Sequence, residues 1–262
     1  MRKDFPLYYW TPDSKNDNFG DTLSYILVRS IVGPQLAFIN TKDRRSYCKK
    51  SKLLAIGSIF HFACKHDVIW GSGILNPTKF PFFNNSRLIN TIDIRAVRGP
   101  RTRNALIAKY NIDVPEIYGD PALLLPFYLK SYKKSVKSII PILLILHYKD
   151  AKQRRIHSEL KKIVTVDAFL PWEILLKMIL QSEFVISTSL HGLIVSEAFG
   201  IQARFLKSSL INVFQFHDYY EGTNRPLEFA TTIDEAIAMG GQQLPKINLT
   251  KLLNAFPFDK FA

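Results

Sequence analysis

The sequence has little of several features that mark specialised classes of protein. Among its 262 residues there are only two cysteines, Cys48 and Cys64, and neither a CxxC nor an HExxH spacing occurs. A domain stapled by several disulfides is therefore not expected, and no metal site is predicted. No run of about 18 uncharged apolar residues is present, so no transmembrane helix is predicted.

Signs of disorder and of a secretion signal are also scarce. Proline and glycine are not enriched, and no low-complexity tract appears, so most of the chain is expected to fold. The apolar stretch near the N-terminus, residues 5–10, is too short and too aromatic for a signal peptide. Together with the few cysteines, this predicts a cytoplasmic protein.

Acidic residues are the scarcer charge, at 22 against 35 Lys and Arg, which gives a formal net charge of +13. The basic residues gather in three clusters: Lys42, Arg44, Arg45, Lys49, Lys50 and Lys52; Lys130, Lys133, Lys134 and Lys137; and Lys149, Lys152, Arg154 and Arg155. A phosphorylated substrate, anionic lipid and nucleic acid are the polyanions that would explain this excess, and a solvated basic surface is the alternative. No recognised nucleic-acid module is present, so nucleic acid is not an expected partner.

Short apolar runs alternate with helical patterns along the chain. Strands are predicted at 5–10, 52–58, 67–73, 91–99, 139–148, 163–169, 183–189 and 203–208, and helices at 22–31, 102–109, 150–162, 172–182, 190–200 and 231–241. Strands that are apolar throughout and end in small residues are typical of a parallel sheet covered by helices. The charged segment 126–138 reads as a linker, and the tail 245–262 as a closing helix over one of the halves.

This pattern predicts an α/β protein of two Rossmann-like, doubly wound lobes, residues 1–128 and 129–262, that face a cleft. In such sheets ligands bind beyond the carboxyl ends of the strands, so the cleft is the predicted site.

The segment STSLHG (187–192) has the residues of an anion site at the end of one predicted strand. Ser187, Thr188 and Ser189 offer hydroxyl donors, and the following helix begins with unpaired N–H groups. His191 then stands in the first turn as a candidate general acid, and Gly192 permits close approach. The alternative is that a serine only caps the helix and that His191 only packs.

Four further strand ends carry candidate ligand-binding residues. Arg98 closes a strand, where a guanidinium can bind a carboxylate or phosphate through two parallel hydrogen bonds. The other candidates lie in turns at the same predicted edge: Asn18, Gly20 and Asp21; Gly71, Ser72 and Gly73; and Asp120. Asp21 read alone is typical of a helix cap. The full GxGxxG pattern of a dinucleotide site is missing.

These motifs occur in one order: NFGD (18–21), GSG (71–73), VRGP (97–100), GDP (119–121) and STSLHG (187–192). In that order they resemble the polysaccharide pyruvyltransferase family. The resemblance implies a fold like the two-lobed GT-B glycosyltransferases, with the acceptor on the first lobe and the donor on the second. It also implies phosphoenolpyruvate as co-substrate, no further cofactor, a catalytic His191 and donor binding by Arg98. Some members carry a basic residue where this chain has Ser189, so Arg225 or Arg95 is expected to supply that contact.

The expected function is therefore transfer of pyruvate from phosphoenolpyruvate to sugar hydroxyls as a ketal, in surface, capsular or exopolysaccharide synthesis. The resemblance further implies an acceptor on a polyprenyl-phosphate carrier and peripheral contact with the anionic inner face of the membrane. The alternative is a GT-B-type glycosyltransferase that uses a nucleotide sugar. A non-catalytic nucleic-acid-binding protein is a third interpretation, which the missing module disfavours.

Overall fold

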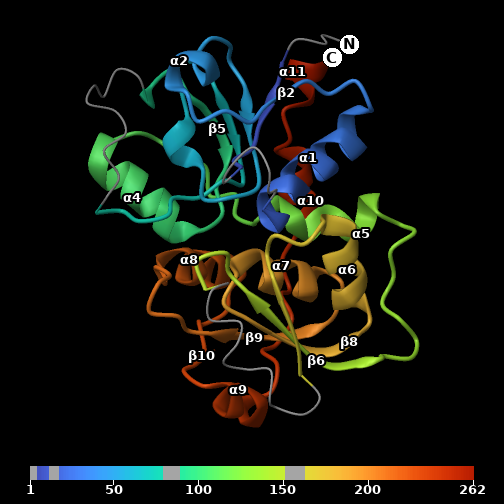
Figure 1. Cartoon of the computed structure of the whole chain (residues 1–262). Coiled ribbons are helices and arrows are strands. Elements are labelled where there is room, and N and C mark those ends of the chain that lie inside the picture. The colour runs from blue at the N-terminus through green and yellow to red at the C-terminus, as the bar shows by residue number, and fades with distance from the viewer. Residues whose placement is uncertain (1–4, 12–17, 79–88, 151–162) are drawn as a thin grey trace.

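The computed structural model of the chain describes residues 5–11, 18–78, 89–150 and 163–262. Within them, two parallel β-sheets covered by helices form an α/β fold, as the sequence predicts (Figure 1). The helix predicted at 150–162, with Lys152, Arg154 and Arg155, lies outside the described residues. No helix in the described part of the chain is long and apolar enough to cross a membrane.

The first sheet has the strand order β2-β1-β3-β4-β5, and all of its strand pairs are parallel. Its strands are β1 (Leu7–Tyr8), β2 (Phe38–Ile39), β3 (Leu53–Leu54), β4 (Val68–Trp70) and β5 (Asp93–Ala96). The helices of this half are α1 (Phe19–Val32), α2 (Arg44–Tyr47) and α4 (Pro100–Tyr110). Every residue of β1, β3 and β4 is buried, as expected for parallel strands that are covered on both faces.

The second sheet has the order β10-β9-β8-β6-β7 and is also parallel. Its strands are β6 (Ile140–Leu146), β7 (Ile163–Asp167), β8 (Ser182–Ser187), β9 (Gln202–Leu206) and β10 (Phe229–Ala230). The helices α6 (Trp172–Leu180), α7 (Leu190–Ala198) and α8 (Phe214–Gly222) lie on the side that faces the first sheet, whereas α9 (Ile233–Met239) lies on the far side (Figure 1).

One hydrophobic core joins the two sheets. The same cluster of buried side chains includes Leu7 and Trp70 of the first sheet and Leu143 and Leu193 of the second half. Helices α1 and α7 contact each other, and both contact the short 3-10 helix η2 (Pro121–Leu124). The interface between the halves is thus a packed core with a site at its edge.

The segment predicted as a linker begins with a short helix, α5 (Leu125–Tyr128), and then runs without regular structure to β6. The tail helices α10 (Leu249–Asn254) and α11 (Phe258–Phe261) return to the first sheet. There the Trp70 indole Nε1 donates to the Leu252 carbonyl at 2.7 Å, and the Phe256 ring meets the Trp70 ring edge-on. The tail therefore crosses the boundary predicted at 128/129, and Phe261 of α11 meets the Phe5 ring edge-on beside the first sheet (Figure 1).

Helix α8 is the main element that the sequence patterns do not predict. Its sequence, FQFHDYYEG, sets Phe216, Tyr219 and Tyr220 at helical spacing, but Gln215 and Asp218 are buried beside them, so polar residues interrupt the apolar pattern. Strands β2 and β10, of two residues each, are also absent from the prediction.

Candidate active site

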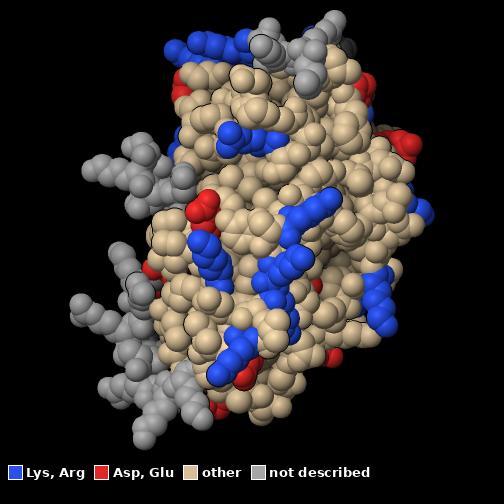
Figure 2. All heavy atoms as spheres, turned by 90° about the vertical axis from the view of Figure 1, so that its right-hand side faces the viewer, with Lys and Arg blue, Asp and Glu red and all other residues tan. Residues whose placement is uncertain are grey.

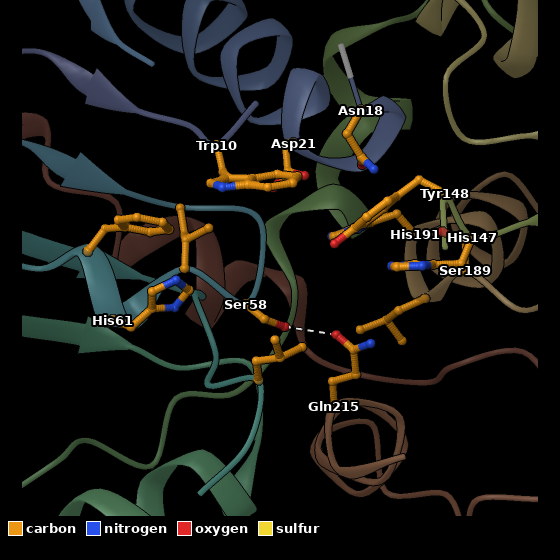
Figure 3. A pocket seen from close by; sticks show the side chains of 14 residues that line it. Trp10, Asn18, Asp21, Ser58, His61, His147, Tyr148, Ser189, His191 and Gln215 are labelled. Atoms are coloured by element: carbon orange, nitrogen blue, oxygen red, sulfur yellow. Dashed lines mark hydrogen bonds between the residues drawn. The ribbon is translucent and has the colours of Figure 1, made fainter. Parts of the chain in front are cut away.

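A cavity of about 200 Å³ lies where strand ends of both sheets meet (Figure 3). Its lining follows the carboxyl ends of β1, β3 and β4 in the first sheet and of β6, β8 and β9 in the second. This is the edge at which parallel α/β sheets bind ligands. The lining residues are Trp10, Asn18, Asp21, Ser58, Ile59, His61, Phe62, Leu75, His147, Tyr148, Ser189, Leu190, His191 and Gln215.

His191 stands in the first turn of α7 and faces this cavity (Figure 3). The start of α1 packs directly on its ring, because a Cβ at Gly20 would lie only 2.1 Å from His191 Nδ1. Only glycine permits that approach, so Gly20 serves the histidine rather than a ligand. The first and last motifs of the sequence thus meet at one imidazole.

Asp120 lies behind the imidazole. Its Oδ1 accepts the Ala122 N–H at the start of η2, and its Oδ2 lies 3.6 Å from His191 Nε2. Both of these atoms are buried and have no closer partner. Asp120 is not part of the cavity lining, so its predicted contact with substrate is not seen, and its place is that of a carboxylate that orients the ring.

Asp21 lines the cavity on the α1 side. It does not cap α1, because the Asn18 side chain does so by accepting the Gly20 N–H at 3.1 Å. Burial raises the pKa of the Asp21 carboxyl to about 7, an effect that the charge of His191 opposes and that of Asp120 reinforces. Asp21 therefore exchanges a proton near neutral pH, which suits an acid–base role.

Only one hydroxyl of the predicted triplet reaches the cavity. Ser187 is fully buried, and its Oγ accepts the Ser189 N–H and lies 3.0 Å from the Ile145 carbonyl. A Cβ at Gly192 would lie 2.4 Å from that Oγ, so Gly192 packs on Ser187. Thr188 Oγ1 donates to Asp150. Ser187 and Thr188 thus stabilise the strand end, and Ser189 faces the cavity.

Arg98, which was predicted to bind the donor, does not line the cavity. The side chain is fully buried and pairs through Nε with Asp218 of α8 at 3.2 Å. Its Nη1 donates to Ser58 at 2.7 Å, and its Nη2 donates to the Ile74 carbonyl at 3.0 Å. The strand-end position was identified correctly, but the guanidinium points into the protein and satisfies a buried carboxylate.

The Arg98 contacts reach the cavity through Ser58. Ser58 accepts from Arg98 and donates to Gln215 Oε1 at 2.9 Å, and both Ser58 and Gln215 line the cavity (Figure 3). Arg98 therefore fixes one residue from each half. The GSG turn supports this arrangement: a Cβ at Gly73 would lie 2.4 Å from Arg98 Nη2, and Ser72 donates to the Gly57 carbonyl. Gly71 packs on Pro121, and none of the three turn residues lines the cavity.

The arginines proposed as substitutes for the basic position at Ser189 are also occupied. Arg225 is buried and forms a two-pronged pair with Glu197, with Nη1 and Nη2 at 3.0 and 2.7 Å. Arg95 pairs with Asp93 and with Asp259 of the tail. Neither lines the cavity. Among the residues that the structure describes, no lysine or arginine lines it.

Several lining residues were not identified from the sequence, and each follows a strand. Trp10, Ser58, His61, His147, Tyr148 and Gln215 are the polar and aromatic ones. Burial lowers the pKa of His147 to about 4, so its ring is neutral at pH 7. Its Nδ1 accepts the Lys149 N–H at 3.2 Å, which leaves the proton on Nε2 as a donor. Burial likewise lowers the pKa of His61 to about 4.

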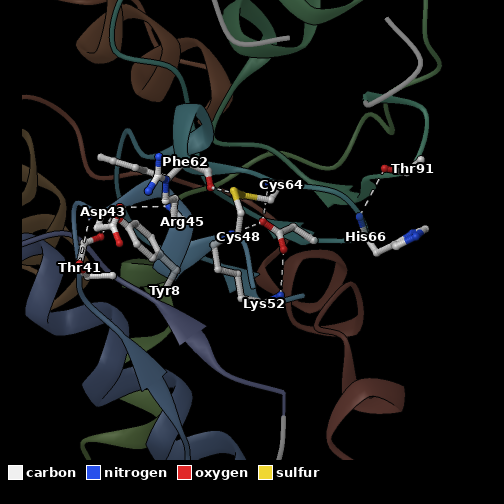
Figure 4. The surroundings of a disulfide bond; sticks show 11 residues. Tyr8, Thr41, Asp43, Arg45, Cys48, Lys52, Phe62, Cys64, His66 and Thr91 are labelled. Carbon is white, nitrogen blue, oxygen red and sulfur yellow. Dashed lines mark hydrogen bonds and ion pairs between the residues drawn. A yellow bond between two sulfur atoms is a disulfide. The ribbon is translucent and has the colours of Figure 1, made fainter. Parts of the chain in front are cut away.

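The wall that carries Ser58, His61 and Phe62 is fastened at both ends (Figure 4). Cys48 and Cys64 form a disulfide 16 residues apart, just beyond the 3-10 helix η1 (Phe60–Phe62). Asp67 accepts the Cys64 N–H at 2.7 Å and pairs with Lys52 Nζ at 2.5 Å, with both side chains fully buried. The cluster in the sequence suggested that Lys52 belongs to a basic surface, but its side chain is buried and is not part of one.

No set of three or more His, Cys, Asp or Glu side chains is arranged to hold a metal ion in the part of the chain that the structure describes. The site can donate hydrogen bonds from neutral groups, exchange a proton at Asp21, and stack a ligand on aromatic rings.

Comparison with known proteins gives one match to a protein family. The family model of polysaccharide pyruvyl transferase matches residues 2–209. No curated protein matches the chain significantly. Among solved structures, the chain is similar to a functionally uncharacterized protein from Klebsiella pneumoniae subsp. pneumoniae NTUH-K2044, at 15% identity and a TM-score of 0.47, over 87% of this chain and 93% of that one.

Proposed function

The chain belongs to the polysaccharide pyruvyl transferase family, and from this premise we propose that it moves pyruvate from phosphoenolpyruvate onto two hydroxyls of one sugar. The product is a cyclic ketal in a surface polysaccharide, such as a capsule or exopolysaccharide. The observation that carries the proposal is the convergence of the NFGD, GDP and STSLHG motifs on His191 at the rim of one cavity. Phosphoenolpyruvate is a co-substrate, and no further cofactor is proposed.

The reaction needs one proton donor and one acceptor. A proton adds to the methylene carbon of phosphoenolpyruvate, and a sugar hydroxyl attacks the adjacent carbon and loses its own proton. The C–O bond to phosphate then breaks, and a second hydroxyl closes the ring, with its proton leaving on the phosphate. An imidazole and a carboxyl with a raised pKa, both lining the cavity, suit this sequence of steps.

His191 and Asp21 are the groups proposed for these transfers. The imidazole, positioned by Asp120 at 3.6 Å and by Gly20, supplies the first proton. Asp21, with a pKa of about 7, accepts the proton of the attacking hydroxyl. The carboxylate and phosphate of the donor accept hydrogen bonds from Ser189, from His147 Nε2 and from the first N–H groups of α7.

The aromatic wall of the cavity is the proposed place of the acceptor sugar. Trp10 and Tyr148 come from different sheets, and their ring centroids lie 5.9 Å apart. Aromatic faces pack well on the apolar faces of sugar rings and leave the hydroxyls at the ring edge free for hydrogen bonds. With the acceptor on Trp10 and the donor near α7, the first half binds the acceptor and the second the donor, as in a GT-B-like arrangement of lobes 1–128 and 129–262.

The second candidate function is a glycosyltransferase that uses a nucleotide sugar. The cavity in the described residues, at about 200 Å³, is smaller than the roughly 300–1,000 Å³ of typical sites for drug-sized ligands. Phosphoenolpyruvate is far smaller than a nucleotide sugar, so this size favours the pyruvyl donor.

Phosphate release from phosphoenolpyruvate, measured against a panel of polyprenyl-phosphate-linked sugars, tests the proposal. We expect release that depends on both an acceptor and His191. His66→Asn is a matched control, because His66 is an exposed histidine with φ of 64°, a conformation that asparagine tolerates. Thermal stabilisation by a nucleotide sugar but not by phosphoenolpyruvate would instead support the glycosyltransferase.

A further inference from the structure

The segment that joins the two sheets, residues 126–139, exposes apolar side chains that a soluble surface rarely shows together. Phe127 is 60% exposed, Ile139 is 66% exposed, and Val136 is fully exposed. All three lie in one short stretch on the right-hand side of Figure 1. Single exposed apolar residues are ordinary, but three within one segment indicate an interaction surface.

The same joining segment carries four exposed lysines, Lys130, Lys133, Lys134 and Lys137. Three of them, together with Tyr132 and Phe199, line a surface hollow of about 450 Å³. None of the four forms an ion pair with an acidic residue of the described chain. Figure 2 shows the face that the segment crosses, where basic side chains outnumber acidic ones. The hollow therefore favours an anion, with apolar side chains beside it.

We propose that the joining segment is a docking surface for a membrane that contains anionic phospholipids. Lys130, Lys133 and Lys134 bind lipid phosphates at the hollow. Phe127, Val136 and Ile139 enter the boundary between headgroups and acyl chains. Basic side chains beside exposed apolar ones are the composition that binds such an interface.

Two other occupants fit the segment less well. A second copy of the chain would bring the same lysines face to face across a two-fold interface, which like charges oppose. A nucleic acid would leave Val136 and Ile139 without a partner, because their side chains form no hydrogen bonds with phosphates or base edges. The inference does not depend on the proposed chemistry, since none of these residues lines the cavity at His191.

Sedimentation of the full chain with vesicles tests the inference. We expect binding to phosphatidylcholine vesicles that contain phosphatidylglycerol, little binding to pure phosphatidylcholine, and a decline as salt rises. Lys133→Glu/Lys134→Glu should lower the partition coefficient at least tenfold. Lys49→Glu/Lys50→Glu is the matched control, because it makes the same change at two adjacent exposed lysines of the first half. Val136→Ser/Ile139→Ser should lower partition several-fold at unchanged charge.

Three outcomes would overturn the inference. The wild type fails to bind anionic vesicles at low salt, the two lysine pairs lose binding equally, or the serine variant binds like the wild type. Thermal unfolding of each variant shows that it is folded. Inorganic phosphate at matched ionic strength distinguishes a site for free phosphate, which would compete at millimolar concentration, from a lipid surface, which would not. Light scattering identifies a dimer that forms through the segment, which would also overturn it.

Discussion

The two halves of the molecule build the site in different ways. In the second sheet β6–β9 are five to seven residues long, whereas no strand of the first sheet exceeds four. The second half supplies a regular scaffold from which α7 presents His191. The first half supplies loops, which carry Trp10 and Ser58, and the first turn of α1, which carries Asp21. Short strands fix such loops weakly, so the first half holds them by cross-links.

Three such cross-links, one disulfide and two buried ion pairs, hold the wall of the cavity in the first half. The Cys48–Cys64 disulfide and the buried Lys52–Asp67 pair fasten the wall on either side of β3. The Arg98–Asp218 pair fastens the same wall to the other half. Variants that remove one cross-link at a time test whether the first half depends on them while the second does not.

The largest effect is expected from Arg98→Met. It leaves Asp218 buried without its cation, which costs about 3–5 kcal/mol in the free energy of unfolding. Urea denaturation measures this loss. A double-mutant cycle with Asp218→Asn should show strong coupling, because both side chains form one network with Thr102. Additive effects would mean that the pair does not hold the halves together.

His191→Asn tests the second half. Removing one acid–base group should lower kcat by about a hundredfold or more. Stability should change little, because the side chain has one distant partner, Asp120 at 3.6 Å. Asp120→Asn should lower kcat less and leave the KM for phosphoenolpyruvate unchanged, as expected of a positioning residue. A variant at His191 with nearly wild-type kcat contradicts the assignment.

Cys48→Ser/Cys64→Ser tests the wall. Opening a loop of this length should lower the free energy of unfolding by about 2–3 kcal/mol. Because the loop carries His61 and Phe62, the KM for the acceptor should rise more than the KM for the donor. If stability falls while the KM values for acceptor and donor are both unchanged, the disulfide stabilises the fold but does not shape the binding site.

Asp21→Asn should have the smallest effect on stability, and one that depends on pH. The Asp21 pKa is raised from 3.8 to about 7 in the folded protein, so the folded state binds an extra proton between those values. Stability therefore falls as pH rises through this window, by roughly 1–2 kcal/mol after allowance for its partial exposure. The variant should gain stability relative to the wild type between pH 5.5 and 8 in urea denaturation. If the difference in the free energy of unfolding between variant and wild type does not change with pH, Asp21 keeps an ordinary pKa.

The comparison of the halves also explains what sequence reasoning predicted and what it missed. Buried apolar runs predicted the parallel strands and the edge at which the site lies, because strand ends mark the ligand side. The side chains that face the cavity were harder to identify. Arg98 and Trp10 both follow strands, yet Arg98 turns inward to Asp218, 120 residues away. No local pattern encodes such a partner.

Three other features were not predicted correctly from the sequence: helix α8, the disulfide and the role of the motif glycines. Helix α8 buries Asp218 and Gln215 among aromatic residues, so its apolar pattern is too weak to predict a helix. Two cysteines 16 residues apart gave no spacing that predicts their pairing. Glycines in the motifs suggested close approach of a ligand, but at Gly20 and Gly73 the approaching group is a side chain of the protein itself.

The returning tail has a consequence for the order in which the protein is made. Synthesis from the N-terminus delivers all of the first sheet early, yet the carbonyl that accepts the Trp70 indole N–H belongs to Leu252, near the C-terminus. Domains commonly fold as they leave the ribosome, N-terminal part first. Here Trp70 and Phe5 pack on Phe256 and Phe261, which are translated only after the whole second sheet. The first half is thus translated first, yet its packing is completed only after the second sheet has been translated.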